Sequence, residues 1–215
     1  IGLGVSIMDI EILERLHSKR NQVYKVRYND GSDKLGVMKK YDSNNHKLLE
    51  TEYENMKKLL DHGISIPRVI YKDSRCLITE YIHGYLVNDL VEMLDMGDWI
   101  DKLALWMASF HKIAGLKGNL LKGDVNLRNF IYSQGNIYGL DFEDLDYGEP
   151  RRDLANICFF ILTNKPSFTR EKHMMIRAFL NSYEKYSENK LESMGRYLLW
   201  SREEAKRRRA VKILE

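Results

Sequence analysis

The most informative stretch of this sequence is KGDVNLRNFIYSQGNIYGLDFEDLDYGEPRRD, which runs from Lys122 to Asp153. Within it, Asp124 stands five residues before Asn129, and Asp141 comes twelve residues after Asn129. The short apolar runs FIY and IYGL lie on either side of SQGN, a pattern that predicts two strands joined by a tight turn. Such a hairpin brings Asn129 and Asp141 to the same end of a two-strand unit.

These three polar side chains match the needs of phosphoryl transfer from ATP. The reaction requires a carboxylate beside the acceptor hydroxyl and oxygen ligands for the magnesium ions that bridge the phosphates. Asp124 is the candidate catalytic carboxylate, and Asn129 and Asp141 are the candidate metal ligands, because D-x-x-x-x-N is the spacing of a kinase catalytic loop. Aspartate and asparagine also cap ordinary turns. Their placement around the predicted hairpin favours an ATP- and Mg²⁺-dependent kinase.

The composition is typical of a soluble globular protein and gives no sign of a nucleic-acid partner. Of the 215 residues, 44% are hydrophobic and 30% are charged, which is ordinary for a soluble globular protein. The 34 basic and 31 acidic residues nearly balance, which argues against nucleic acid as a partner. Cys76 and Cys158 lie far apart in apolar runs and are expected to be buried free thiols in a reducing compartment.

The start of the chain carries no targeting signal that we recognise. Its opening IGLGVSI lacks a basic lead and soon meets Asp9 and Glu11, while Met8 opens a plausible reading frame. No apolar run reaches the length of a membrane span. We therefore expect a cytoplasmic protein without a membrane span.

The pattern of elements changes near Gly84. Before it, strands are expected at 10–16, 22–28, 34–41, 68–73 and 75–82, with one helix at 47–63. After it, helices are expected at 99–113 with Asp98 as cap, at 153–162, at 170–187 and from 191 to the end. The prediction is an α+β protein with an N-terminal nucleotide-binding lobe at 1–83 and a helical C-terminal lobe at 84–215.

In this order, the motifs resemble those of the protein-kinase-like superfamily, and within it those of the aminoglycoside phosphotransferase and choline kinase branch, over about Ile10–Leu162. The run D-F-E at 141–143 and Y-G-E-P-R-R-D-L-A at 147–155 are similar to that branch, whereas protein kinases have D-F-G. The resemblance implies a bilobal fold, with a small antiparallel-sheet N-lobe plus one helix and a mainly helical C-lobe. It also implies that Asp153 braces the catalytic loop, although an N-cap of its helix explains Asp153 equally well.

A lysine and a glutamate of the first lobe are expected to form a pair that serves the nucleotide phosphates. The run G-V-M-K ending at Lys39 resembles the V-A-I-K strand of kinases. Strand alternation favours Lys39 over Lys40. The resemblance favours Glu52 as its partner, with Glu50 and Glu54 as alternatives.

The segment LITEYIHG resembles the hinge between the lobes of a kinase. The resemblance implies that an adenine edge binds there to the carbonyl of Glu80 and the amide of Ile82. A plain edge strand is the alternative interpretation.

Two features depart from the family pattern. The loop HSKRNQ between the first two strands has no glycine, so the phosphates would be approached by backbone amides from Ser18 to Asn21, helped by Lys19 or Arg20. The residue two before the catalytic aspartate is usually histidine, and here it is Lys122. We expect activity to survive this change, with the loop held differently.

The connection after the metal ligand is too short to form a platform for a peptide. Only eleven residues separate Asp141 from Asp153, which favours a small-molecule hydroxyl as acceptor. Four carboxylates in this segment favour a cationic acceptor, such as an amino sugar or amino alcohol. Local pairing with two arginines is the alternative. The residues concerned are Glu143, Asp144, Asp146 and Glu149, with Arg151 and Arg152.

Two further interpretations stay open. One is a compact atypical serine/threonine protein kinase of the RIO type, which also lacks a long activation segment. The other is a kinase-shaped binding module without activity. The C-terminal run AKRRRAVK is interpreted as a solvated helix end, with a phosphate-rich partner as the alternative.

Overall fold

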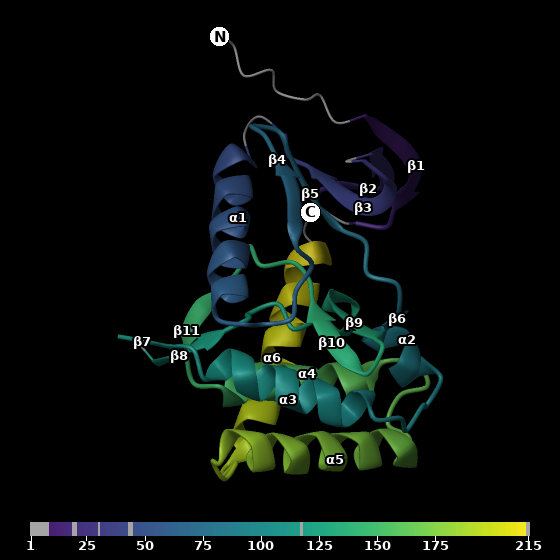
Figure 1. Ribbon diagram of the computed structural model, residues 1–215. Coiled ribbons are helices and arrows are strands. Elements are labelled where there is room, and N and C mark those ends of the chain that lie inside the picture. Colours follow the sequence, from purple (N-terminus) through teal and green to yellow (C-terminus); the bar gives the residue numbers. More distant parts are fainter. Residues whose placement is uncertain (1–8, 19–20, 30, 43–44, 117, 214–215) are drawn as a thin grey trace. The chain divides into compact units, whose positions relative to one another are not determined.

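The computed structural model describes residues 9–18, 21–29, 31–42, 45–116 and 118–213, with side chains up to residue 207. These residues form two compact units (Figure 1). The first unit comprises the chain up to Leu60 together with Ile66–His83, and the second comprises Asp61–Ser65 and the chain from Gly84 on.

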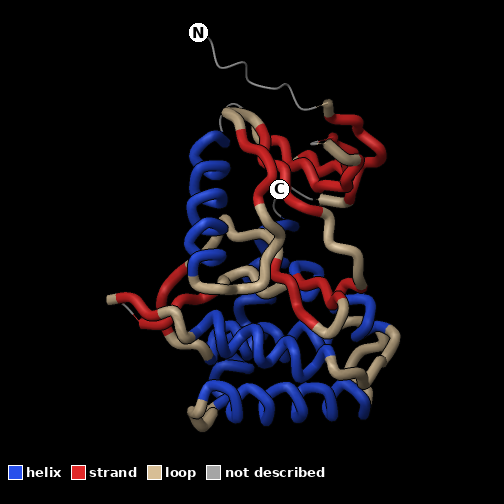
Figure 2. Tube along the Cα trace, viewed as in Figure 1, coloured by secondary structure: helices blue, strands red, loops and turns tan. Residues whose placement is uncertain are grey.

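The first unit is a five-stranded antiparallel sheet with one helix. The strand order is β1-β2-β3-β5-β4, and helix α1 lies between β3 and β4 in the chain. Figure 2 shows these strands in red with α1 in blue alongside. The five strands and the helix predicted from the sequence are therefore confirmed. Their bounds are β1 (Ile10–Leu16), β2 (Gln22–Asn29), β3 (Asp33–Lys40), α1 (His46–Asp61), β4 (Val69–Lys72) and β5 (Cys76–Glu80).

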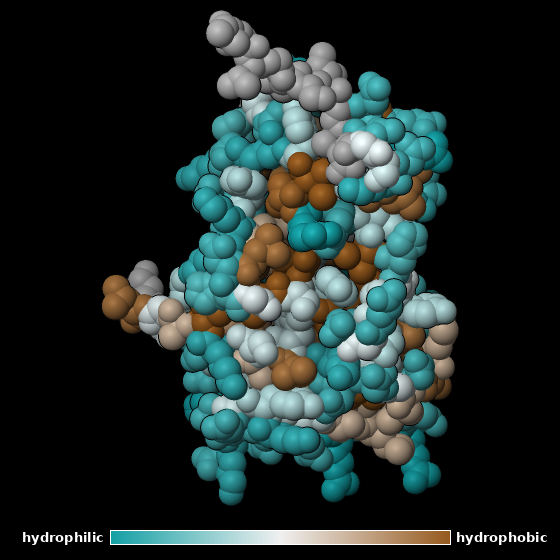
Figure 3. Space-filling model, in the orientation of Figure 1, coloured by the Kyte–Doolittle hydropathy of each residue, from teal (hydrophilic) through white to brown (hydrophobic). Residues whose placement is uncertain are grey.

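Side-chain alternation explains why this sheet forms. Val26, Met38, Cys76 and Ile78 are buried together in a hydrophobic cluster. Helix α1 buries one apolar stripe at helical spacing, and the surface over its outer side is hydrophilic in the space-filling view (Figure 3). At the β2–β3 turn, Gly31 adopts a φ of 107°, which favours glycine.

The second unit is mainly helical. Helix α3 packs against α5, and α4 packs against both α5 and α6. Six of the 13 residues of α4 are buried and the others are half-buried, which agrees with its run of apolar residues. The helices are α2 (Val87–Glu92), α3 (Trp99–His111), α4 (Arg151–Thr163), α5 (Arg170–Ser187) and α6 (Met194–Ile213).

Two small sheets complete the second unit, with strand orders β10-β9-β6 and β11-β8-β7. The predicted hairpin is the pair β9 (Phe130–Ser133) and β10 (Asn136–Gly139). The other strands were not predicted, because runs of two to four residues are too short to show a periodic pattern. They are β6 (Tyr85–Leu86), β7 (Ala114–Gly115), β8 (Gly118–Leu121) and β11 (Asp146–Gly148).

Two predicted helix caps are wrong. Asp98 precedes α3, but its side chain makes no capping hydrogen bond and instead accepts one from the hydroxyl of Tyr132. Pro150, not Asp153, occupies the N-cap position of α4. The carboxylate of Asp153 is instead used by the catalytic loop, as described below.

The cysteines and the polarity of the helices bear on two further predictions. Both cysteines are buried free thiols, as expected. Among the helices of the described residues, none is long and apolar enough to cross a bilayer.

Candidate active site

The first unit brings Lys39 and Glu52 together. Lys39 lies near the end of β3, and its Nζ is 2.8 Å from Oε2 of Glu52 in α1. The two side chains are 16% and 5% exposed, so water screens this ion pair little. The hydroxyl of Tyr41 also donates a hydrogen bond to Oε2 of Glu52. This is the pair that the sequence favoured.

The alternative residues are engaged elsewhere. Lys40 is exposed, and its Nζ lies 5.3 Å from the centre of the Tyr24 ring. Glu50 forms an ion pair with Lys72 at 2.6 Å, and Glu54 is exposed. The geometry therefore selects Lys39 with Glu52.

The predicted adenine-binding segment begins at the end of β5, a strand of the five-stranded sheet. Glu80 is the last residue of β5 and pairs with Gly36 of β3. Its amide donates to the carbonyl of Arg68 at 2.9 Å, and its carboxylate meets the guanidinium of Arg68 at 2.9 Å. Ile82 follows two residues later in a half-buried, irregular segment. The adenine contacts of Glu80 and Ile82 stay predictions.

The predicted phosphate loop connects β1 to β2. Ser18 is exposed and Asn21 is half-buried at the two sides of this connection. Lys19 and Arg20, the two basic candidates, lie outside the described residues. The phosphate-binding role of this loop stays a prediction.

In the second unit, Asp124 follows β8 in a loop that requires a glycine. Gly123 has a φ of 75°, and a Cβ built on it would lie 2.3 Å from the carbonyl oxygen of Asp144. Asp124 is exposed, and its Oδ1 accepts a hydrogen bond from the amide of Asn126 at 3.1 Å. The loop thus presents a carboxylate that is held at one oxygen and reachable from solvent.

The hairpin brings the two candidate metal ligands to one end. Phe130 pairs with Gly139, and the amide of Leu140 donates to the carbonyl of Asn129 at 2.8 Å. Asp141 comes next in the chain, with a φ of 60° that is uncommon outside glycine. The side-chain amide of Asn129 donates to the carbonyl of Asp124 at 3.3 Å, and Asp141 directly follows Leu140, so the three residues lie at one end of the hairpin.

The donor set of this group fits magnesium. When Nδ2 of Asn129 donates to Asp124, its Oδ1 is left as the ligand atom, and Asp141 adds a carboxylate. Both are hard oxygen donors, and Mg²⁺ prefers a few such ligands together with water and phosphate oxygens.

Asp153 of α4 holds the predicted catalytic loop through its carboxylate. Its carboxylate accepts hydrogen bonds from the amides of Lys122 at 2.7 Å and Gly123 at 3.3 Å. The same carboxylate lies 3.3 Å from Nε2 of His111, whose Nδ1 lies 2.9 Å from the hydroxyl of Tyr183. Burial, and next the charge of Asp153, raise the pKa of Tyr183. The structure thus supports the bracing role that the resemblance implied.

The two residues that lie behind Asp153, His111 and Tyr183, were not predicted from the sequence. His111 and Tyr183 are 2% and 3% exposed, although each stands in a helix that also has a solvent face. The one available signal was a polar side chain on an apolar helix stripe, which predicts a buried hydrogen bond without naming its partner.

Comparison with known families identifies the fold family. Residues 8–150 match the family model of the RIO domain. The chain belongs to the RIO domain family. No curated protein sequence matches this RIO domain significantly.

Solved structures show the same fold in small-molecule kinases. Choline kinase from Cryptosporidium parvum aligns with 91% of this chain and 79% of its own chain, at 13% identity and a TM-score of 0.59. Aminoglycoside phosphotransferase APH(2'')-Ib, bound to ADP, aligns over 92% and 82%, at 15% identity and a TM-score of 0.62. A macrolide 2'-phosphotransferase from Brachybacterium faecium aligns over 92% and 83%, at 12% identity and a TM-score of 0.63. The predicted protein-kinase-like fold is therefore confirmed.

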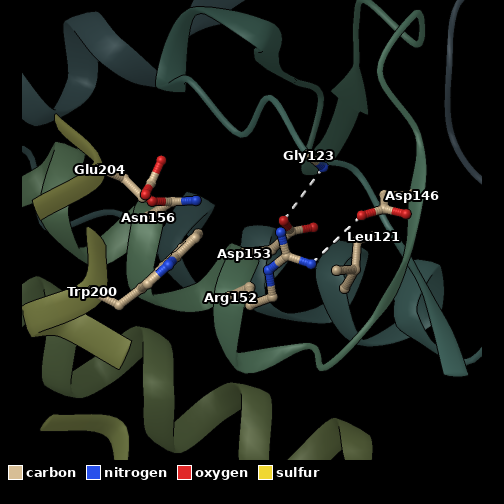
Figure 4. Close-up of a pocket in the computed structure, with 8 residues that line it drawn as sticks. All are labelled: Leu121, Gly123, Asp146, Arg152, Asp153, Asn156, Trp200 and Glu204. Carbon is tan, nitrogen blue, oxygen red and sulfur yellow. Dashed lines mark hydrogen bonds and ion pairs between the residues drawn. The ribbon is translucent and has the colours of Figure 1, made fainter. Parts of the chain in front are cut away.

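A pocket of about 210 Å³ opens beside the loop that contains Gly123, between α4 and α6 (Figure 4). Gly123 and Asp153 lie on one side, and Trp200 and Glu204 of α6 lie on the other. The guanidinium of Arg152 lies 5.4 Å from the centre of the Trp200 ring. Charged and polar side chains share the lining of the pocket with apolar ones, among them the aromatic ring of Trp200.

Arginines pair with part of the acidic segment. Arg151 meets Glu149 at 3.0 Å, and Arg152 meets Asp146 at 3.5 Å. Local pairing, the alternative to a cationic acceptor, therefore accounts for two of the four carboxylates.

Ion pairs also occur in the basic run of α6. Arg207 pairs with Glu204 at 2.9 Å, and Lys206 pairs with Glu203 at 2.9 Å. This agrees with a solvated helix end.

Proposed function

We propose that this RIO domain is an ATP- and Mg²⁺-dependent phosphotransferase that moves the γ-phosphate to the hydroxyl of a small molecule. One observation carries the proposal: Asp124, Asn129 and Asp141 lie at one end of the β9–β10 hairpin, where Asn129 binds the carbonyl of Asp124 and the amide of Leu140. Phosphoryl transfer depends mainly on positioning and on charge stabilisation, and this group can contribute to both.

Each residue of the group has a distinct role in the proposal. Asp124 orients the acceptor hydroxyl and takes its proton, because one of its carboxylate oxygens is fixed by Asn126 and the residue faces solvent. Asn129 and Asp141 hold Mg²⁺, which neutralises the charge of the phosphates when bound. Asp153 keeps the loop in place from α4.

The first lobe, residues 1–83, is proposed to bind the nucleotide. Lys39, oriented by Glu52, supplies a positive charge for the phosphates. In support, the related fold of APH(2'')-Ib was solved with ADP. The adenine is assigned to Glu80 and Ile82. The phosphate loop is assigned to Ser18, Lys19 and Asn21.

The acceptor is proposed to be a small and possibly cationic alcohol bound by the helical lobe, residues 84–215. Structures of the same fold include a choline kinase and aminoglycoside phosphotransferases, and the substrates in these names are cationic alcohols. The segment 141–152 contains five carboxylates and two arginines, so its field attracts cations. Buried free cysteines agree with a reducing, cytoplasmic setting.

A protein serine or threonine is the second candidate acceptor. Membership of the RIO domain family favours it, because the RIO type named above is a compact serine/threonine protein kinase. The short connection from Asp141 to α4 leaves little room for a peptide platform and counts against it.

Turnover of ATP in the presence of Mg²⁺ tests the proposal. Wild type and Asp124→Asn are assayed with cationic alcohols, neutral sugars and protein acceptors. Loss of the carboxylate is expected to lower kcat by about 10²- to 10⁴-fold, the usual contribution of a general base. Asp95→Asn, which alters an exposed aspartate of the same unit, serves as the matched control and is expected to keep full activity.

The pattern of acceptors decides between the candidates. Phosphorylation of a cationic alcohol supports the proposal, and phosphorylation of protein alone supports the second candidate. If no acceptor is phosphorylated and no nucleotide shifts the melting temperature, the domain is a binding module and the proposal is wrong.

A further inference from the structure

Lys122 is almost completely buried, although it lies in the catalytic loop. The residue is 1% exposed. Its Nζ donates a hydrogen bond to the carbonyl oxygen of Asp124 at 2.9 Å and another to that of Asp141 at 2.9 Å. One side chain therefore connects the proposed catalytic aspartate to a proposed metal ligand.

The cost of burying this ammonium group indicates that its charge and donors are used. An unpaired buried charge costs several kcal/mol, so the group needs close partners. Besides the two carbonyl oxygens, the rings of Phe142 and Phe130 have their centres 5.0 and 5.6 Å from Nζ. Both lie within the range of about 6 Å for cation–π attraction. A methionine would fill the same space without any cost of desolvation, so volume alone does not explain a lysine at this position.

The main chain of Lys122 is itself anchored. Its amide donates to the Asp153 carboxylate at 2.7 Å, which ties the residue to α4. From this fixed point, the side chain binds Asp124, which is two residues away in the chain, and Asp141, which is nineteen residues away. The hydrogen bond to Asp141 also helps to hold that residue at its uncommon φ of 60°.

We propose that Lys122 is the positioning residue of the metal site. By holding the carbonyls of Asp124 and Asp141, it sets the spacing between the carboxylate that orients the hydroxyl and the carboxylate that holds the cation. Both metal affinity and turnover then depend on a side chain that touches neither metal nor substrate. The inference rests on the proposed function, and its experiment separates the two.

Two measurements test the inference on the full chain. The first is the Mg²⁺ concentration that gives half-maximal turnover. The second is the binding of Mn²⁺ in the presence of ADP, followed by electron paramagnetic resonance, which needs no turnover. In Lys122→Met, both metal constants are expected to weaken about tenfold or more, as for other residues that orient metal ligands. The KM for ATP at saturating Mg²⁺ is expected to change little.

The chain offers a matched control in Lys172. This lysine of α5 is also fully buried and also donates through Nζ to a carbonyl, that of Asn164. Lys172→Met is expected to lower stability and to leave both metal constants unchanged. Lys122→Arg keeps the charge and can donate to two carbonyls, so it is expected to bind Mn²⁺ within about threefold of wild type.

Equal metal constants in Lys122→Met and wild type would overturn the inference, as would equal shifts in Lys122→Met and Lys172→Met. Should Lys122→Met fail to fold, Lys122→Gln, which retains one donor group, takes its place with the same criteria. If wild type phosphorylates no acceptor but Lys122→Met still weakens Mn²⁺ binding, the proposed function fails and the inference about Lys122 holds.

Discussion

The two units position their candidate active-site residues by different means. In the first unit, Lys39 is held by other side chains, since its ammonium meets Glu52 and the same carboxylate accepts from Tyr41. In the second unit, main-chain groups take part in most of the contacts. Asp153 accepts from two amides, and the carbonyl of Asn129 accepts from the amide of Leu140.

Because of this difference, we expect turnover and stability to respond separately to substitution in the first unit and together in the second. A pair of side chains can be replaced by a neutral pair of similar size without loss of the fold. Backbone amides cannot be replaced, so the removal of their acceptor leaves buried donors without partners. We therefore expect a neutral replacement of the Lys39–Glu52 pair to change turnover alone. Substitution of Asp153 is expected to change turnover and stability together.

The largest effect is expected for Asp153→Ala. The change leaves the amides of Lys122 and Gly123 and the ring of His111 without their buried acceptor, which costs about 3 kcal/mol or more of unfolding free energy. Urea denaturation followed by circular dichroism measures this loss. Asp146→Ala, which removes an exposed partner of Arg152, is the control and is expected to cost less than about 1 kcal/mol. Equal losses of unfolding free energy in Asp153→Ala and Asp146→Ala would contradict the stabilising role of Asp153.

An intermediate effect is expected for the double substitution Lys39→Met with Glu52→Gln. No unpaired charge remains, so the unfolding free energy should stay within about 1 kcal/mol of wild type. Turnover should fall about 100-fold or more, since a charge that stabilises the phosphates is lost. The same denaturation assay and a kcat measurement test both parts. A large loss of stability would show that this pair supports the fold as much as Asp153 does.

The smallest effect is expected in the reactivity of the two cysteines. Each unit contains one: Cys76 lies in β5 and Cys158 in α4. Burial raises the pKa of Cys76 to about 11 and that of Cys158 to about 12, so both thiols are protonated at pH 8 and react only when their surroundings open.

Labelling with a disulfide reagent is measured in Cys76→Ser and Cys158→Ser variants, which keep one thiol each. Adding Asp153→Ala is expected to speed the labelling of Cys158 and to leave that of Cys76 unchanged. Equal acceleration at both cysteines would mean that the two units open together, and the contrast between them would be lost.

Strong local patterns in the sequence predicted much of this protein. Alternating apolar residues gave the strands of the first unit, and helical spacing gave α1, α3, α4 and α5 within a few residues. The tight turn between FIY and IYGL placed Asn129 and Asp141 at one end of a hairpin. Short strands such as β6 and β11 have no such signal, because the strands with which they pair lie far away in the chain.

Two caps show where local reasoning fails. Asp98 and Asp153 both stand where a helix begins, and aspartate there commonly caps the first turn. Asp98 instead binds Tyr132, and Asp153 binds the loop of Lys122. A carboxylate accepts the strongest donors that the fold brings to it, and those donors lie 31 to 34 residues away in the chain.

The sequence alone therefore determined the elements, the order of the motifs and the identity of the polar residues, because these depend on neighbours in the chain. Apart from the pair of Lys39 with Glu52, which the resemblance favoured, the partners of buried charges were decided by the tertiary structure. Lys122 is the clearest case: in the sequence it is a departure from the family pattern. In the fold it joins Asp124 to Asp141, since a buried ammonium group must find acceptors wherever packing places them.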